Sequence, residues 1–273
     1  MVCLPTQHRT ADIEAASSQQ PPPYYSDSDS DDPSPAPGTT FRDLGLHGAR
    51  SFAGIATRAF FLGAAVAASA IVGPYLFVVA SSSLWRLPFF FGALALFHFL
   101  EFWTTAAYNT PNAETDSFLL TANWPAYAIA HAAATLECLI THVVVPDRTH
   151  APLLLAIGTF LVVVGQVVRS AAMMRAGQSF NHQVQKSRTE SHKLVTNGIY
   201  SVLRHPSYFG FFWWAIGTQL VLGNWVCLVG YGLALWRFFS VRIRREEALL
   251  VKFFGDEYVE YRKRVGTKLP FCG

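Results

Sequence analysis

The chain has 273 residues, of which 51% are apolar and only 14% are charged, whereas ordinary soluble domains carry about 25% charged residues. This balance indicates a membrane protein rather than a water-soluble domain. The net charge of +3 is too small, and the basic residues are too scattered, to indicate a nucleic-acid-binding protein.

The N-terminal segment, residues 1–45, is rich in Ser, Pro, Gln and Asp and contains the run PPPYYSDSDSDDPSPAP. Such a composition cannot bury enough apolar surface to offset the entropy of the chain. We therefore expect a disordered, acidic tail on the cytosolic side. Its acidic serine run is more typical of a solvated spacer than of a phosphorylation switch.

Four apolar segments follow within residues 46–178, each near or above the roughly 20 residues that a helix needs to cross the hydrocarbon core. They cover residues 53–80, 86–107, 118–145 and 151–174. This pattern predicts four transmembrane helices.

The next apolar run, from Pro206 to Phe239, is too long for one crossing, and Gly223 and Asn224 form a turn signal in its middle. A tight helical hairpin is therefore expected. The predicted fold is an all-α, polytopic membrane protein with about six transmembrane helices. Both ends of the hairpin should lie on one side, and the positive-inside rule makes that side the cytosol. The basic residues that flank the hairpin are Lys186, Arg188, Lys193, Arg204, Arg242, Arg244 and Arg245.

A C-terminal amphipathic helix is predicted in the segment EEALLVKFFGDEYVEYRKRV, residues 246–265, with Gly255 as a weak point midway. Its apolar residues recur every three or four positions at Leu250, Phe254, Tyr258, Tyr261 and Val265. The spacing fits a lid or membrane-docking element as well as a plain packing helix.

Two polar clusters bracket the hairpin, and we expect them to meet and form the active site. They are HKLVTNGIYSVLRHPSYFG, residues 192–210, and RIRREE, residues 242–247. Arg242 and Glu246 are four residues apart and share one face of a helix. A basic cluster after a span is by itself more often an orientation signal, but the facing cluster favours a functional site.

Within the first cluster, Pro206 suits the first turn of a helix, whose free amide groups favour an anion. The aromatic and imidazole rings there could stack on a planar ring or bond a ribose, although aromatic residues also gather at membrane interfaces for lipid reasons alone. These rings belong to His192, Tyr200, His205 and Tyr208.

The sequence gives no sign of a metal site or of a soluble nucleotide-binding domain. The spacings of His182, His192 and His205 offer no paired ligands on a helix face, and the four cysteines are isolated. Neither GxGxxG nor GxxxxGK[ST] occurs.

The last third of the chain, residues 179–271, resembles the isoprenylcysteine carboxyl methyltransferases, membrane enzymes that methylate the C-terminal prenylcysteine of processed CaaX proteins. The matching motifs, in order, are SFNHQVQ, HKLVTNGIY, RHPSYFGFF, IGTQLVL, RIRREE, FFGDEYVEYRKRV and LPF. So many spaced matches in one order are highly specific.

The resemblance implies a catalytic region, residues 179–273, that binds S-adenosyl-L-methionine (AdoMet). Arg242 matches the substrate-binding arginine of the family, and Glu246 closes the cofactor pocket; we count both as catalytic. The implied cofactor-binding residues are Gln185, His192, Lys193, Leu194, Val195, Tyr200, His205, Pro206, Ser207, Tyr208 and Glu246.

The resemblance also implies the partners and the location. The partners are the prenylated C-terminal cysteine of CaaX-processed proteins, such as small GTPases and prenylated peptides, and membrane lipid, with no nucleic acid and no metal. The location is the endoplasmic reticulum membrane, with a multi-pass chain whose active site faces the cytosol.

The chemistry agrees with this expectation, because a carboxylate is already ionised near neutral pH and needs no general base. Positioning should supply most of the rate. Three alternatives stay open: a phospholipid N-methyltransferase, which would methylate an amine; a membrane sterol reductase, which would bind NADPH; and a non-enzymatic scaffold.

Overall fold

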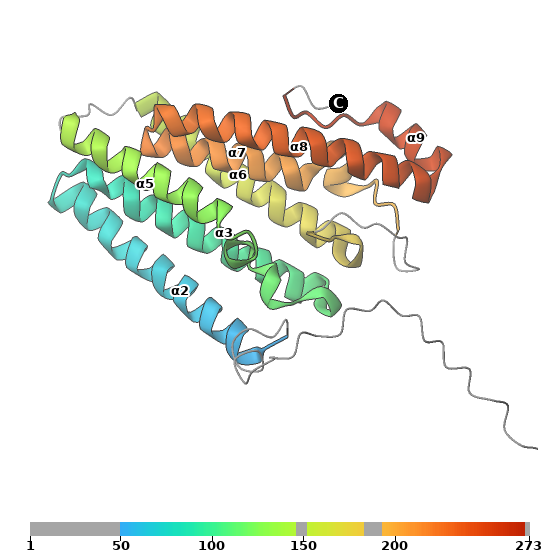
Figure 1. Ribbon diagram of the computed structural model, residues 1–273, viewed down its shortest axis with the longest axis horizontal. Helices are drawn as coiled ribbons and strands as arrows, with labels where there is room; N and C mark the ends of the chain where they lie inside the picture. Colours follow the sequence, from blue (N-terminus) through green and yellow to red (C-terminus); the bar gives the residue numbers. More distant parts are fainter. Residues whose placement is uncertain (1–49, 146–151, 183–192, 271–273) are drawn as a thin grey trace, which may run out of the picture. The chain divides into compact units, whose positions relative to one another are not determined.

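The computed structural model describes residues 50–145, 152–182 and 193–270. Within these ranges, successive long helices run in alternate directions along one bundle (Figure 1). They are α2 (Phe52–Pro74), α3 (Arg86–Tyr108), α5 (Ala126–Val144), α6 (Pro152–Ala176), α7 (Pro206–Leu222) and α8 (Trp225–Phe254); the short helices are α4 (Leu119–Ala122) and α9 (Asp256–Arg264). The prediction of an all-α fold is confirmed.

Five segments of the described chain are long and apolar enough to cross a membrane. They are Phe52–Val79, Ser83–Tyr108, Ala126–Val144, Pro152–Ser179 and Trp225–Phe254. Helix α7 is shorter, with 17 residues, and it packs against both α6 and α8. The third segment differs from its prediction because α4 and a turn occupy residues 119–125, so that α5 begins only at Ala126.

The predicted hairpin is present as α7 and α8, and its turn has a clear physical cause. Gly223 ends α7 with φ +68°, a left-handed conformation that glycine adopts without strain. The side-chain Nδ2 of Asn224 donates to the carbonyl oxygen of Ala134 on α5 at 2.8 Å. Glu137 of α5 accepts from the first amides of α8, those of Val226 and Cys227, at 2.8 and 2.7 Å. The turn is therefore fixed against α5.

Glycine pairs bring α6 and α7 into backbone contact. A Cβ atom on Gly165 would lie 2.6 Å from the carbonyl oxygen of Gly210, and one on Gly217 would lie 2.7 Å from that of Gly158. Each helix carries its two glycines seven residues apart, so both pairs fall on the shared face. Small residues at helix contacts are the usual basis of tight packing in membranes. This contact fixes α7 against the first and middle parts of α6.

We expect Gly165→Ala to destabilise the protein by about 1–3 kcal/mol, because the added methyl group must push two backbones apart. Thermal unfolding of the detergent-solubilised protein would measure the loss. Gly63→Ala on α2 is the matched control, since a Cβ there meets nothing within 4 Å. Equal stability of the two variants would contradict the role of the glycine contact.

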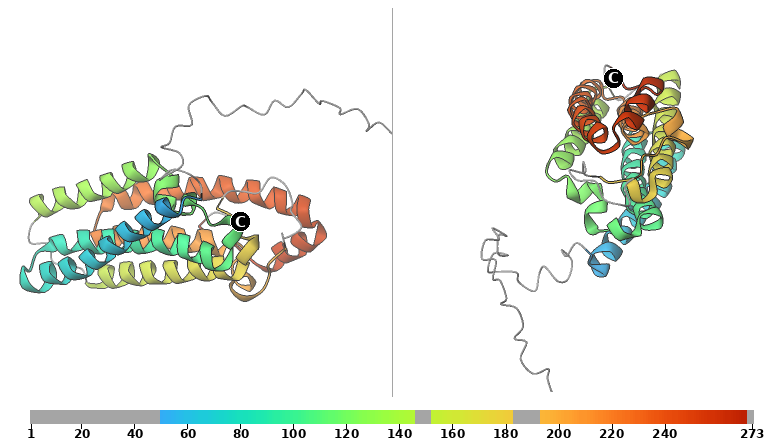
Figure 2. Two further views of the ribbon diagram at one scale, coloured as in Figure 1. Left: turned by 90° about the horizontal axis from the view of Figure 1, so that it is seen from below. Right: turned by 90° about the vertical axis from the view of Figure 1, so that its right-hand side faces the viewer.

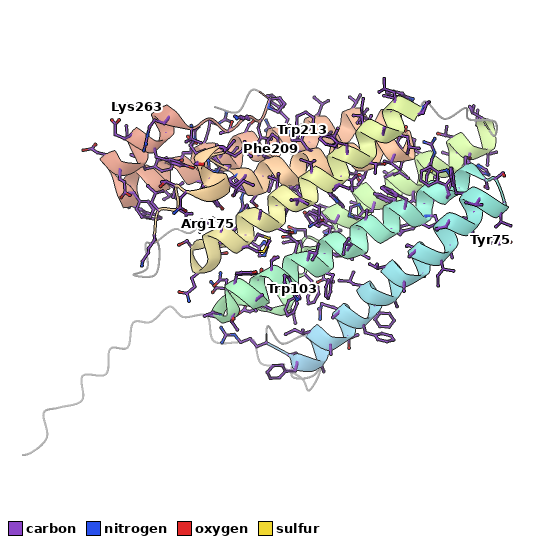
Figure 3. All side chains as sticks on the ribbon, turned by 180° about the vertical axis from the view of Figure 1, so that it is seen from behind. Tyr75, Trp103, Arg175, Phe209, Trp213 and Lys263 are labelled. Carbon is purple, nitrogen blue, oxygen red and sulfur yellow. The ribbon has the colours of Figure 1, made fainter. Side chains whose placement is uncertain are left out.

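The predicted amphipathic helix is broken at Gly255, and the continuous form of that prediction is wrong. Its first half is the end of α8, and Gly255 has φ +56° and ψ −133°, a conformation open essentially to glycine alone. Helix α9 then turns back beside α8 (Figures 1 and 2). Figure 3 shows Lys263 of α9 and Arg175 of α6 at one end of the bundle and Tyr75 at the opposite end.

Candidate functional site

Segments distant in sequence meet at the end of the bundle that carries α9. A cavity, here called the loop cavity, lies between the end of α6, the segment 193–205, the start of α7, the end of α8, and α9. Nine of the eleven predicted cofactor-binding residues line it: Lys193, Leu194, Val195, Tyr200, His205, Pro206, Ser207, Tyr208 and Glu246. The other two, Gln185 and His192, lie outside the described residues.

A second cavity, here called the arginine cavity, adjoins the first and holds Arg242. The two cavities share Phe180, Asn181, Ser207 and Tyr208 as lining residues. The arginine cavity continues along Tyr127 of α5 and Phe211 of α7. The two polar clusters therefore lie side by side, and they line two cavities that have a common wall.

Tyr208 links Arg242 to Glu246 at this wall. Its hydroxyl donates to Glu246 Oε2 at 2.5 Å and accepts from Arg242 Nε at 2.7 Å. Helix α8 continues through Arg242 and Glu246. These residues are four positions apart and therefore lie on one face of the helix, as predicted. The guanidinium also lies 5.4 Å from the Tyr208 ring centroid, a cation–π contact that fixes its plane.

Arg242 has one guanidinium nitrogen that no described residue binds. Its Nη2 donates to the carbonyl oxygen of His182, while Nη1 has no hydrogen-bond partner among the described residues. Burial lowers the pKa of His182 to about 4. The imidazole is therefore neutral near pH 7 and adds no positive charge beside Arg242.

A buried ion cluster holds the start of α7 in place. Arg204 Nε donates to Glu247 Oε1 at 2.7 Å, and His205 Nε2 lies 3.2 Å from the same oxygen. Arg204 is itself buried. The His205 ring stacks on Tyr208 with centroids 5.5 Å apart, so Glu247 positions Tyr208 indirectly through His205.

Two charged residues inside the membrane helices were missed by the sequence analysis. Arg169 of α6 donates from Nε to Glu101 Oε1 on α3. Its Nη2 donates to the other carboxylate oxygen, Glu101 Oε2, at 2.6 Å. Its Nη1 donates to the hydroxyl and carbonyl oxygens of Ser207, at 2.9 and 3.1 Å. Both charged side chains are almost fully buried. A single charge in an otherwise apolar span is the signal that could have found them.

Helix α9 forms one wall of the loop cavity and is held there by packing and a hydrogen bond. Tyr258 and Tyr261 line the cavity and pack on Leu194 and Phe254. The Tyr261 hydroxyl donates to the carbonyl oxygen of Tyr200 at 2.6 Å. Burial raises the pKa of Tyr261 to about 12, so the hydroxyl remains a donor at physiological pH.

An apolar opening, here called the lateral slot, runs between α5 and α8 away from Arg242. It shares Tyr127 and Phe211 with the arginine cavity. On α8, one helical stripe leads from Arg242 through Phe238 and Leu235 to Tyr231 and Cys227. The slot has a volume of about 350 Å³, within the usual range for small-molecule sites.

In the described ranges, no three His, Cys, Asp or Glu side chains come together in a way that could hold a metal ion. The polar chemistry of the site consists instead of a guanidinium, carboxylates, imidazole and tyrosine hydroxyls. Such a set can bind an anion at Arg242 and a polar or cationic molecule beside Glu246.

Comparison with known proteins gives one consistent result. The family model of the isoprenylcysteine carboxyl methyltransferase (ICMT) family matches residues 156–252. The protein-S-isoprenylcysteine O-methyltransferase of Xenopus laevis is 45% identical over 219 residues, covering 80% of this chain and 73% of the relative. The Saccharomyces cerevisiae protein of the same name is 48% identical over 185 residues, covering 66% of this chain and 77% of the relative.

A solved structure gives the same match. It is the eukaryotic intramembrane Ras methyltransferase ICMT (isoprenylcysteine carboxyl methyltransferase), with a TM-score of 0.74 and 39% identity. The alignment covers 80% of this chain and 76% of that one.

Proposed function

Because the chain belongs to the isoprenylcysteine carboxyl methyltransferase family, we propose that it binds AdoMet in the loop cavity and the prenylcysteine carboxylate at Arg242. The protein is a multi-pass membrane methyltransferase that acts on S-prenylated C-terminal cysteine. The comparisons do not favour a phospholipid N-methyltransferase or a sterol reductase.

The loop cavity has the side chains that AdoMet requires. Glu246 supplies a negative charge next to the shared wall, where a sulfonium cation would be attracted. Leu194, Leu250 and Phe254 supply apolar surface for a flat ring. Pro206 starts α7 beside them, and the free amides of that first turn favour a carboxylate. Bound AdoMet supplies the methyl group on its positively charged sulfur.

The shared wall of the two cavities is the observation that carries this proposal. Tyr208 contacts Arg242 on one side and Glu246 on the other. Arg242, with Nη1 available, would hold the acceptor carboxylate and aim it across the wall. Because that nucleophile is already ionised, the residues of the site need only orient it and limit its contact with water.

We further propose that the lateral slot receives the prenyl chain directly from the bilayer. Its lining is almost wholly apolar, and Gly230 and Ala234 on α8 are exposed along it. A prenylcysteine with its carboxylate at Arg242 would extend its chain along the α8 stripe toward Tyr231 and Cys227. Burial of each chain carbon would add roughly 0.8 kcal/mol.

Substitution of Gly230 by Phe should raise the KM for a farnesylated acceptor about 10-fold or more. The new ring would occupy part of the slot, so fewer carbons of the farnesyl chain could be buried there. A Cβ on Gly230 meets nothing within 4 Å, and Gly230 is exposed, so the new side chain starts in open space. Gly63→Phe is the matched control, as its site on α2 is equally open. An unchanged KM in Gly230→Phe would argue against the slot as the prenyl site.

The proposed location is the endoplasmic reticulum membrane, with the site facing the cytosol. Exposed cations gather at the site end, on α8 and α9: Arg244, Arg245, Lys252, Arg262, Lys263 and Arg264. The positive-inside rule supports a cytosolic position for that end. AdoMet would then enter from water while the prenyl chain enters from lipid.

The direct test is to incubate membranes that contain the protein with methyl-labelled AdoMet and N-acetyl-S-farnesylcysteine. Label in a base-labile methyl ester is the expected result, and the carboxamide analogue of the acceptor, as control, should take up none. Absence of label, with AdoMet binding intact, would overturn the assigned acceptor. Absence of AdoMet binding would overturn the assigned donor.

A further inference from the structure

The hydroxyl of Tyr258 on α9 is the feature of the loop cavity that the site described so far leaves unexplained. Tyr258 lines the cavity and is 1% exposed, and its hydroxyl has no hydrogen-bond partner within residues 50–145, 152–182 and 193–270. Buried polar atoms almost always have a partner, so an orphaned hydroxyl calls for an explanation. The absence of a partner cannot be traced to poor packing, because Tyr258 belongs to a buried cluster with Tyr261 and Val265.

The neighbours of Tyr258 show which part of the cavity it serves. Leu194, Leu250 and Phe254 pack against its cluster and line the same cavity. Glu246, Tyr208 and the start of α7 line the same cavity. An apolar surface with one hydrogen-bond donor suits a flat heteroaromatic ring, whose faces need apolar contact and whose edge carries acceptor nitrogens.

We propose that the Tyr258 hydroxyl donates a hydrogen bond to a ring nitrogen of the cofactor's adenine, which makes α9 part of the cofactor site. This inference rests on the proposed binding of AdoMet. Tyr258 is a binding residue outside the set that the family resemblance implied. Burial raises the pKa of Tyr258, so its proton is retained at physiological pH.

The geometry of α9 gives the hydroxyl a fixed position. Arg204 donates from Nη1 to the carbonyl oxygens of Val265 and Arg262, at 2.7 and 3.1 Å. The Tyr261 hydroxyl ties the same helix to Tyr200 at 2.6 Å. Hence α9 is anchored on both sides of the cavity before any ligand arrives, and the donor is already in place for binding.

The test is equilibrium binding of S-adenosylhomocysteine to the detergent-solubilised protein and to Tyr258→Phe, together with thermal unfolding of both. Loss of one neutral hydrogen bond should weaken binding about 3- to 10-fold. The ligand-free variant should unfold at the same or a higher temperature than wild type, because Phe removes a buried hydroxyl that had no partner. A merely structural tyrosine would give unchanged affinity, and that result would overturn the proposal.

Tyr261→Phe is the matched control, because its hydroxyl already has a protein partner. We expect it to lower the unfolding temperature of the ligand-free protein, the change that Tyr258→Phe should not produce. If Tyr258→Phe instead lowers the ligand-free unfolding temperature as much as Tyr261→Phe does, its hydroxyl has a structural partner and the proposal fails.

Analogues of S-adenosylhomocysteine in which N1, N3 or N7 of the adenine is replaced by C–H identify the acceptor. One analogue should bind wild type more weakly than the parent compound, yet bind Tyr258→Phe as well as the parent does. If no analogue shows this pattern, the adenine assignment is wrong. If wild type does not bind S-adenosylhomocysteine at all, the proposed cofactor fails instead, so the two failures are distinguishable.

Discussion

Arg242→Lys should lower kcat/KM for a prenylcysteine acceptor by about 100-fold or more, with AdoMet binding retained. Arg242 donates to Tyr208 and to the His182 carbonyl, and its Nη1, which has no partner in the part of the chain that the structure describes, can bind the carboxylate. A lysine ammonium has no planar fork and cannot reach all three partners in one plane. The charge is preserved in this variant, but the orientation of the acceptor is lost.

Steady-state methylation and a separate AdoMet binding measurement would check this expectation. Arg244→Lys is the matched control, because Arg244 lies two residues away on the same helix and is exposed. It should keep near-normal turnover. Turnover close to wild type in Arg242→Lys would show that a single positive charge suffices and would remove the orientation argument.

Arg169→Met should destabilise the protein by about 3–5 kcal/mol, because it leaves the Glu101 carboxylate buried without its partner. The pair lies inside the bundle, with side-chain exposures of 7% and 1%. Thermal unfolding in detergent would measure the loss. Arg175→Met on the same helix is the control, since Arg175 is exposed and donates to the surface residue Asn197.

The double variant Arg169→Met with Glu101→Met separates stability from activity. Replacement of both charges by apolar side chains should restore most of the stability. Activity should stay low, because Ser207 loses both bonds from Arg169 at the wall between the cavities. If the double variant regains full activity, the pair serves the fold alone and does not position the site.

The bundle and its hairpin could be predicted from the sequence because their signals are local. Apolar length marks the spans, and Gly223 with Asn224 marks the turn. The pairing of Glu101 with Arg169 could not be predicted in this way, because the residues are 68 positions apart. Hydropathy averages also conceal a single charge within an apolar span. Only the packing of α3 against α6 brings the two residues together.

The site could be predicted in part for the same reason. Nine cofactor-binding residues were placed by motif, and they line one cavity; their role in binding stays a prediction. The sequence analysis assigned Glu246 to the cofactor pocket but gave the adjacent Glu247 no role. The two glutamates point to different partners because successive helix residues are rotated by about 100°. Glu246 accepts from Tyr208, whereas Glu247 binds Arg204 and His205. Such a division of roles needs the three-dimensional register of α8.

The return of α9 at Gly255 has a genetic consequence. The segment after that turn bonds to the start of α7, with Arg204 N donating to Gly266 O at 3.0 Å and the Arg204 side chain to Val265 O. A premature stop just beyond Gly255 would leave every membrane helix able to insert, yet it would remove one wall of the loop cavity. We expect the truncated product to insert in the membrane yet lack methyltransferase activity, because it loses that wall and the bonds from α9 to the start of α7.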